Sequence, residues 1–224
     1  MSTKLFENDY FEHRQLNDLK RIKSFNEESD WMKANHVPFN GVVCDVGCST
    51  GEFLDHIHWL GPKYGMEVNE LAISIATKTG VSFSKNILNV ENFFDVIIFR
   101  GTIQHLDKPF QYIEASFKSL KPGGFVVFLA TPNIESIYYR IFNSLPALET
   151  KRSFFLPGSK HLLNLCNRAG FECLNVEYPY YKSGYDRPFL DGAFFLARLF
   201  SFSNRWSAPF PKNMMNILLR RPFE

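Results

Sequence analysis

The chain has 224 residues, a formal net charge of +2 and 45% hydrophobic residues, which suits one domain, residues 1–224, with a sizeable core. So small a charge gives no electrostatic footprint for nucleic acid, and no apolar run is long enough to cross a bilayer. Four cysteines without metal-ligand spacing indicate reduced thiols in a cytoplasmic protein without a bound metal.

Residues 1–38 are charged and amphipathic and predict an N-terminal helical cap. The apolar run 42–46 contains Asp45 and leads into a turn with Gly47 and Gly51, which predicts a buried parallel strand, a tight loop and a helix. The two glycines let the backbone turn sharply beside a ligand, and Ser49 between them is expected to avoid positive φ. The pattern indicates a loop for a nucleotide-type cofactor; a turn that binds nothing is the alternative.

A second strand, residues 63–67, ends in Glu67. An acid about 20 residues after the first loop binds ribose hydroxyls in nucleotide-binding α/β folds, although a solvated glutamate is the alternative. Asn69 and Glu70 open the next helix. A short third strand, 81–84, precedes Asn86, whose side-chain oxygen is expected either to accept a hydrogen bond from an adenine amine or to serve a turn.

A fourth buried strand, 93–99, precedes Arg100 and then a helix with Asp107 as its expected N-cap and Pro109 in its first turn. The apolar stripe of this helix is expected in the core: Phe110, Ile113, Phe117 and Leu120. Residues 121–124 end the helix. A fifth strand (125–130), a helix (159–170), a sixth strand (171–178) and a seventh strand (214–219) follow.

Strands that alternate with helices in this order predict an α/β protein with a doubly wound sheet. Ligands of such sheets bind at the carboxyl ends of the strands. Four polar residues fall at those ends: Asp45, Glu67, Arg100 and Thr131.

The segment 45–51 resembles motif I of class I S-adenosylmethionine-dependent methyltransferases, an acid followed by Gly-x-Gly-x-Gly, with Ser49 replacing the middle glycine. Gln104-His105-Leu106 resembles the family's Glu-His-Leu segment, with Gln104 replacing the acid. The resemblance covers residues 40–180 well and the last strand loosely. It implies a Rossmann-like, mostly parallel seven-stranded sheet with an antiparallel last strand, and S-adenosylmethionine as cofactor, with S-adenosylhomocysteine as product. The cofactor-binding residues it implies are Asp45, Gly47, Cys48, Ser49, Gly51, Phe53, Glu67, Val68, Asn86, Ile87 and Arg100.

The acceptor is a less specific prediction. The chain resembles bacterial small-molecule and cell-surface sugar methyltransferases, which implies O-methylation of a sugar or a sugar-derived glycan precursor. A polyprenyl phenol of the ubiquinone type, or a catalytically silent S-adenosylmethionine-binding partner subunit, are the alternatives. The Arg100-Gly101-Thr102 sequence differs from the Asn-Pro-Pro-Tyr type of DNA amino-methyltransferases and argues against nucleobases.

His105 follows strand four, where the transferred methyl group should lie, so it is the predicted catalytic base or substrate contact; the alternative is that it only braces the loop. Tyr138, Tyr139 and His161 are further predicted substrate residues, although the tyrosines are equally plausible as packing residues.

An aromatic-rich insert, 179–211, separates the cofactor-binding core, 40–178, from the last strand, 212–221. Three roles stay open for it: a lid, a dimer surface, or a patch that rests on a membrane. The default expectation for Phe194 to Phe202, with Arg198, is a buried cover helix. The protein is expected to be a monomer or a homodimer.

Overall fold

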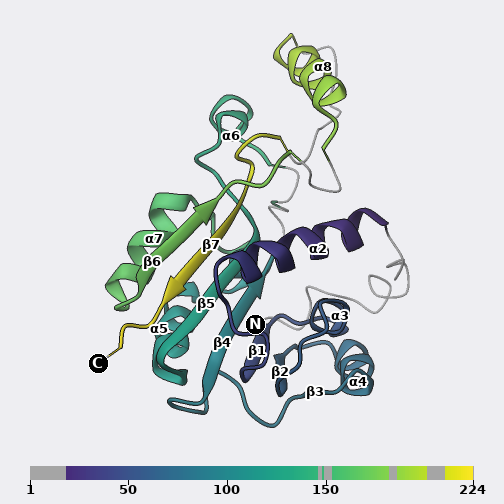
Figure 1. The fold of residues 1–224 in the computed structure, drawn as a ribbon. Coiled ribbons are helices and arrows are strands. Elements are labelled where there is room, and N and C mark those ends of the chain that lie inside the picture. The colour runs from purple at the N-terminus through teal and green to yellow at the C-terminus, as the bar shows by residue number, and fades with distance from the viewer. Residues whose placement is uncertain (1–18, 146–147, 149–152, 182–185, 201–209, 224) are drawn as a thin grey trace.

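The computed structural model describes residues 19–145, 148, 153–181, 186–200 and 210–223. Its strands are β1 (Val43–Val46), β2 (Lys63–Met66), β3 (Val81–Ser82), β4 (Phe94–Arg100), β5 (Leu120–Pro132), β6 (Glu172–Glu177) and β7 (Met214–Arg220). They form one sheet in the order β3-β2-β1-β4-β5-β7-β6 (Figure 1). Neighbouring strands are parallel except at β7, which is antiparallel to both β5 and β6. The predicted α/β sheet with an antiparallel last strand is confirmed.

The described helices are α2 (Leu19–Ala34), α3 (Glu52–His56), α4 (Glu70–Lys78), the 3₁₀ turn η2 (Ile103–His105), α5 (Pro109–Ser119), α6 (Ile137–Phe142), α7 (Ser159–Arg168) and α8 (Pro188–Leu199). Asn69 caps α4, because its side chain accepts a hydrogen bond from the Ala72 N–H at 3.0 Å. The expected N-cap Asp107 is wrong: Lys108 takes that position and Pro109 starts the helix. Leu120 is buried as expected but belongs to β5, which begins earlier than predicted.

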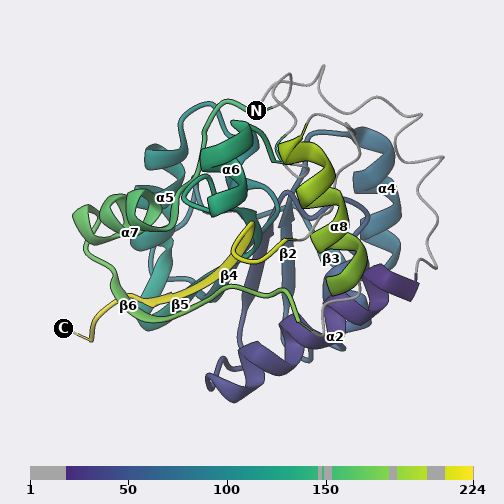
Figure 2. The same cartoon turned by 90° about the horizontal axis from the view of Figure 1, so that it is seen from above.

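The central strand β4 is buried on both faces, which explains its continuous apolar sequence. Its side chains alternate between two clusters. Ile97 and Phe99 pack beneath α5 and α7, together with Ile113, Leu162 and Cys166. Val96 and Ile98 pack beneath α2 and α3, together with Phe25, Met32, Phe53 and Leu54. Figure 2 shows α2 on one side of the sheet and α5 and α7 on the other. The core is therefore two apolar layers that share one sheet.

An ion pair ties three strands together at the edge opposite the carboxyl ends. The Asp95 carboxylate in β4 accepts a hydrogen bond from the Val42 N–H at 2.7 Å, just before β1. It also pairs with Lys121 Nζ in β5 at 2.8 Å. Beside this link Leu120 pairs with Phe94 of β4, so β5 begins at Leu120 and not at the predicted Phe125.

The insert lies partly outside the described residues, which include α8 but not Tyr185, Phe202 or Trp206. Helix α8 stands beyond the carboxyl ends of the parallel strands, away from the sheet (Figure 1). The expected buried cover helix is confirmed on one side of α8, where Phe195 packs against Phe142, and is wrong on the other, where Leu196 is 56% exposed. Among the residues that the structure describes, none of the helices combines the length and hydropathy needed to cross a bilayer.

Candidate cofactor and active site

Asp45 occupies β1 next to its carboxyl end and lies in register with Gly65 of β2 and Ile98 of β4. Its side chain is buried, and Oδ1 has no hydrogen-bond partner within the described residues. The pKa of Asp45 is raised to about 7: burial raises it most, Arg100 lowers it, and Glu67 and Glu28 raise it. A buried carboxylate oxygen without a partner is a place where a bound donor group or cation is favoured.

The loop after β1 takes left-handed backbone conformations at three of its residues. Gly47 has φ 79°, and a Cβ there would lie 2.6 Å from the Thr102 side chain, so only glycine lets this loop pass so close to the segment after β4. Gly51 has φ 75°, and a Cβ there would lie 2.8 Å from the Thr79 hydroxyl. Both glycines are therefore required by packing around the loop as well as by its turn.

Ser49 also takes a left-handed conformation, with φ 51°. The expectation that this serine avoids positive φ is wrong. Its N–H donates a hydrogen bond to Glu67 Oε2 at 3.0 Å, and this bond helps hold the left-handed backbone.

Glu67 clasps the end of β2 to the loop after β1. Its Oε1 accepts hydrogen bonds from the N–H groups of Val68 at 2.7 Å and Asn69 at 3.0 Å, while Oε2 accepts the bond from Ser49. Each carboxylate oxygen can accept two hydrogen bonds. Among the described residues Oε2 accepts this one bond, so it has capacity for a further donor, such as a ribose hydroxyl.

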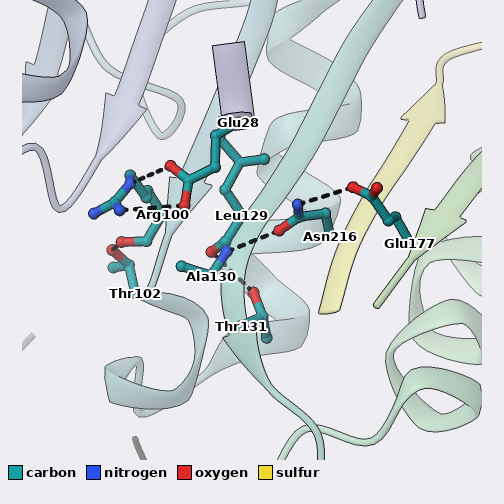
Figure 3. Close-up of polar contacts among 8 residues, drawn as sticks. All are labelled: Glu28, Arg100, Thr102, Leu129, Ala130, Thr131, Glu177 and Asn216. Carbon is teal, nitrogen blue, oxygen red and sulfur yellow. Dashed lines mark hydrogen bonds and ion pairs between the residues drawn. The ribbon is translucent and has the colours of Figure 1, made fainter. Parts of the chain in front are cut away.

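Arg100, at the end of β4, makes a bidentate ion pair with Glu28 of α2 (Figure 3). Nε and Oε2 are 2.6 Å apart, and Nη2 and Oε1 are 3.2 Å apart. The guanidinium also lies over the Phe25 ring, 4.4 Å from its centroid. Burial raises the pKa of Glu28 and Arg100 opposes that shift. The predicted cofactor residue Arg100 therefore reaches the N-terminal helix.

Glu28 was missing from the residues predicted for the site. It lies with Phe25, Ser29 and Met32 on the buried side of α2, at helical spacing. The sequence did contain a signal for Glu28: it is an acid on an otherwise core-facing side of a helix. Such a buried carboxylate needs a charged or hydrogen-bonding partner.

Four other predicted cofactor residues point elsewhere or serve the loop. Phe53 packs edge-on against Phe25, and Ile87 lies in the core beneath the sheet. Cys48 packs with Ala76 and Val81, and burial raises the pKa of its thiol. The Asn86 side-chain oxygen accepts a hydrogen bond from the Leu88 N–H at 2.9 Å, as its turn alternative predicted. In this structure these four side chains therefore support the site by packing beneath it or by stabilising its turns.

His105 lies half-buried in η2, directly after β4. The Gln104 amide Nε2 donates to the Gly101 carbonyl at 2.9 Å and lies 3.3 Å from His105 Nε2. The main-chain carbonyl oxygen of Gln104 accepts hydrogen bonds from the N–H groups of Phe154 and Phe155. This arrangement brings the segment after residue 152, with Phe154 56% exposed, beside the histidine.

The predicted substrate residues have different surroundings. Tyr138 is buried between Phe142, Phe195 and Phe210, and Tyr139 packs against the same cluster, so their packing alternative describes what the structure shows. His161 is exposed on α7, and its ring lies 5.8 Å from that of Phe155.

A bulge shapes the carboxyl end of β5, beside Arg100 (Figure 3). Ala130 has φ 46°, and its N–H donates to Asn216 Oδ1 at 3.0 Å, while the Thr131 hydroxyl donates to the Leu129 carbonyl. A residue other than glycine with positive φ is strained and persists where its surroundings fix it. Asn216 of β7 supplies that support. Within the described residues, no group of three metal-ligating side chains comes together.

A family model described as a methyltransferase domain matches residues 11–176 of the sequence. The chain belongs to this methyltransferase family. The S-adenosylmethionine-dependent methyltransferase of Aquifex aeolicus has the same fold, with a TM-score of 0.64 over 96% of this chain and 99% of that one at 16% identity. The fold of the chain is thus that of S-adenosylmethionine-dependent methyltransferases. The unpartnered Asp45 oxygen, the loop after β1 and the spare capacity of Glu67 fit that cofactor.

Three curated relatives have different acceptors in their names. A tRNA U34 carboxymethyltransferase of Desulfotalea psychrophila is 26% identical over 161 residues, 64% of this chain and 50% of the relative. A mitochondrial ubiquinone biosynthesis O-methyltransferase of Dictyostelium discoideum is 30% identical over 142 residues, which cover 53% of this chain and 44% of the relative. A demethylmenaquinone methyltransferase of Oceanobacillus iheyensis is 25% identical over 218 residues, which cover 80% of this chain and 90% of the relative. The chain spans about half the length of the first two.

Replacing Glu67 with alanine should weaken S-adenosylmethionine binding by about 1–3 kcal/mol, the range for losing a hydrogen bond to a charged group. Isothermal titration calorimetry measures the change, and urea unfolding checks that the fold survives. Glu70→Ala, which removes an exposed acid from the same region, is the matched control and should bind like wild type. Equal affinities for all three proteins would exclude Glu67 as a cofactor ligand.

The buried Asp45 should make the ligand-free protein less stable as pH rises. Its pKa of about 7 in the folded state exceeds the ordinary value of 3.8, so the folded state holds the proton more tightly and loses stability between about pH 4 and 7. Asp45→Asn removes this loss. At pH 8 its free energy of unfolding should exceed that of wild type by up to about 4 kcal/mol, and near pH 4 the gain should vanish.

Urea unfolding at both pH values measures this difference. Asp55→Asn, at an exposed acid of α3, should show no comparable gain. A gain for Asp45→Asn that is the same at pH 4 and pH 8 would contradict the assignment.

Proposed function

We propose that the protein transfers the methyl group of S-adenosylmethionine to a hydroxyl of a lipophilic phenol or hydroquinone. The observation that carries the proposal is the exposed apolar surface beside η2. Phe154 is 56% exposed and Leu156 42% exposed, and the Phe154 N–H is bonded to the carbonyl of Gln104, the residue before His105. An acceptor with an apolar body would cover these side chains while its hydroxyl approaches the histidine.

Two named relatives support this acceptor class. One is a ubiquinone biosynthesis O-methyltransferase and the other a demethylmenaquinone methyltransferase, whose match extends over 90% of its length. The sugar-derived acceptor expected from the sequence stays a prediction. So does the expected lack of a nucleic-acid partner, since several relatives are named for tRNA, and one of them matches over 50% of its length.

When bound, S-adenosylmethionine supplies an electrophilic methyl group on a sulfonium. The residues of the chain position the reaction: Glu67 and the loop after β1 hold the cofactor's ribose side, and Asp45 offers a buried anionic partner. His105 accepts the proton from the acceptor hydroxyl at Nε2. In the structure this nitrogen faces the Gln104 amide at 3.3 Å, and the acceptor hydroxyl would take the place of that amide hydrogen.

The acceptor class is tested by methyl transfer from labelled S-adenosylmethionine to matched acceptors. A prenylated catechol should be methylated at least tenfold faster than a catechol without the prenyl chain, because the chain covers exposed apolar surface. Sugar nucleotides and unmodified tRNA are included as acceptors for the competing predictions. Faster transfer to either of them would overturn the lipophilic acceptor. Cofactor binding without transfer to any acceptor would instead favour the silent partner subunit.

His105→Ala should lower the rate of methyl transfer by about 10²- to 10⁴-fold while cofactor affinity changes little. His58→Asn is the matched control, because His58 is exposed and asparagine tolerates its left-handed backbone. If the His105 variant stays within about threefold of wild type, or loses rate only in step with cofactor affinity, His105 braces the loop.

A further inference from the structure

Helix α8 turns its charged side chains inward. Asp191 is buried and accepts hydrogen bonds from the Tyr180 hydroxyl at 2.8 Å and the Arg187 N–H at 3.1 Å. Arg198 donates to the Ser144 hydroxyl at 3.3 Å and lies over the Phe142 ring. These two are the charged residues of the α8 sequence. A helix on the surface of a globular protein shows the opposite arrangement, with its charges toward water.

The outward side of α8 is apolar along its whole length. Phe189 is 95% exposed, and Leu196, two turns further along the helix, is 56% exposed. The other exposed large side chains of this side are Leu190, Leu199 and, at the C-cap, Phe200. A continuous apolar face of this kind marks a surface that is covered by an apolar partner.

Helix α6 extends the same apolar surface. Ile137 is 58% exposed and Ile141 45% exposed. The two helices are joined through the rings of Phe142 in α6 and Phe195 in α8, whose centroids are 5.5 Å apart. Figure 1 places both helices on the carboxyl-end side of the sheet. We call the exposed apolar residues of α6 and α8 the apolar rim.

Two exposed cationic residues accompany the apolar rim. Arg140 lies between Ile137 and Ile141 in α6, and Arg187 precedes the first turn of α8. Apolar side chains beside arginines are the arrangement by which interfacial helices bind bilayers that carry anionic lipids. The acids nearby are withdrawn from this surface: Asp191 is buried, and Asp186, next to Arg187, is half-buried.

The size of the apolar rim argues against a second copy of the chain as the partner. The twelve residues of α8 and the six of α6 make about 27 Å of helix about 10 Å wide, a footprint of roughly 270 Å². A stable protein interface buries about 800 Å² on each partner. A bilayer requires no such minimum, because its headgroup boundary accepts a single apolar helix face.

We propose that the apolar rim docks the protein on the surface of an anionic bilayer, with α8 lying in the plane of the interface. The inference goes beyond the proposed reaction and does not depend on the identity of the acceptor. Of the three roles that the sequence left open for the aromatic-rich insert, the proposal assigns membrane contact to its helix α8.

Flotation of the full chain with vesicles tests the proposal. Vesicles of phosphatidylcholine with 30% phosphatidylglycerol, about a third anionic lipid of the kind that attracts basic residues, should carry wild type to the top fraction. The double variant Phe189→Ser, Leu196→Ser should bind at least tenfold more weakly. The matched control, Leu60→Ser with Leu88→Ser, removes two exposed leucines far from α8 in sequence and should bind like wild type. Calorimetry with S-adenosylmethionine checks that all variants are folded.

A second pair of variants tests the charge contribution. Arg140→Gln with Arg187→Gln should weaken binding to the anionic vesicles and leave binding to pure phosphatidylcholine unchanged. Wild type that stays in solution with both vesicles, or α8 variants that float like wild type, would overturn the proposal. A dimer in solution that the α8 variants dissociate would overturn it in favour of a second copy. Failure of methyl transfer to a lipophilic acceptor would leave these outcomes unaffected.

Discussion

The ion pair between Glu28 and Arg100 holds the candidate site together, because it balances charge where three carboxyl groups converge. Asp45, Glu67 and Glu28 all act on this edge of the sheet, and Glu67 and Glu28 each raise the pKa of Asp45. Arg100 opposes them, and its own position is fixed by Glu28 and by the ring of Phe25. The Asp45 carboxyl group therefore ionises less readily than an exposed one. A bound ligand with a sulfonium and an ammonium group would favour its charged form, since desolvated charges are stabilised by opposite charge nearby.

The ion pair also explains why the N-terminal helix belongs to the functional unit. A bidentate pair between an arginine and a carboxylate fixes both distance and orientation. Here it joins α2 to the last residue of β4, 72 positions away. Breaking a buried pair by removing one partner leaves a charge uncompensated, which costs about 3–5 kcal/mol. The helix therefore does more than cover apolar surface: it sets the electrostatics of the edge where ligands bind.

Most of the sheet could be predicted because its signals are local. The continuous apolar sequence of β4 follows from burial on both faces, and the glycine-containing turn after β1 follows from close packing against Thr102. Other features depend on contacts between distant residues. Ser49 takes positive φ in company with a bond to Glu67, and Glu28 is identified as a site residue only by its contact with Arg100. The apolar outward side of α8 could not be predicted from composition, because a buried helix and an interfacial helix contain the same residue types.

Glu67 serves two purposes with one carboxylate. It clasps the loop after β1 to the end of β2 through Ser49, Val68 and Asn69, and it is the group expected to receive the ribose. A ligand that bonds to this carboxylate therefore changes how strongly the loop is held in place. By the same coupling, a change in the stability of the loop changes the affinity for the ligand. Occupancy and local rigidity at this edge are linked quantities. The amide of Ser49, about 3 Å from the carboxylate, is the atom at which that linkage can be read by hydrogen exchange.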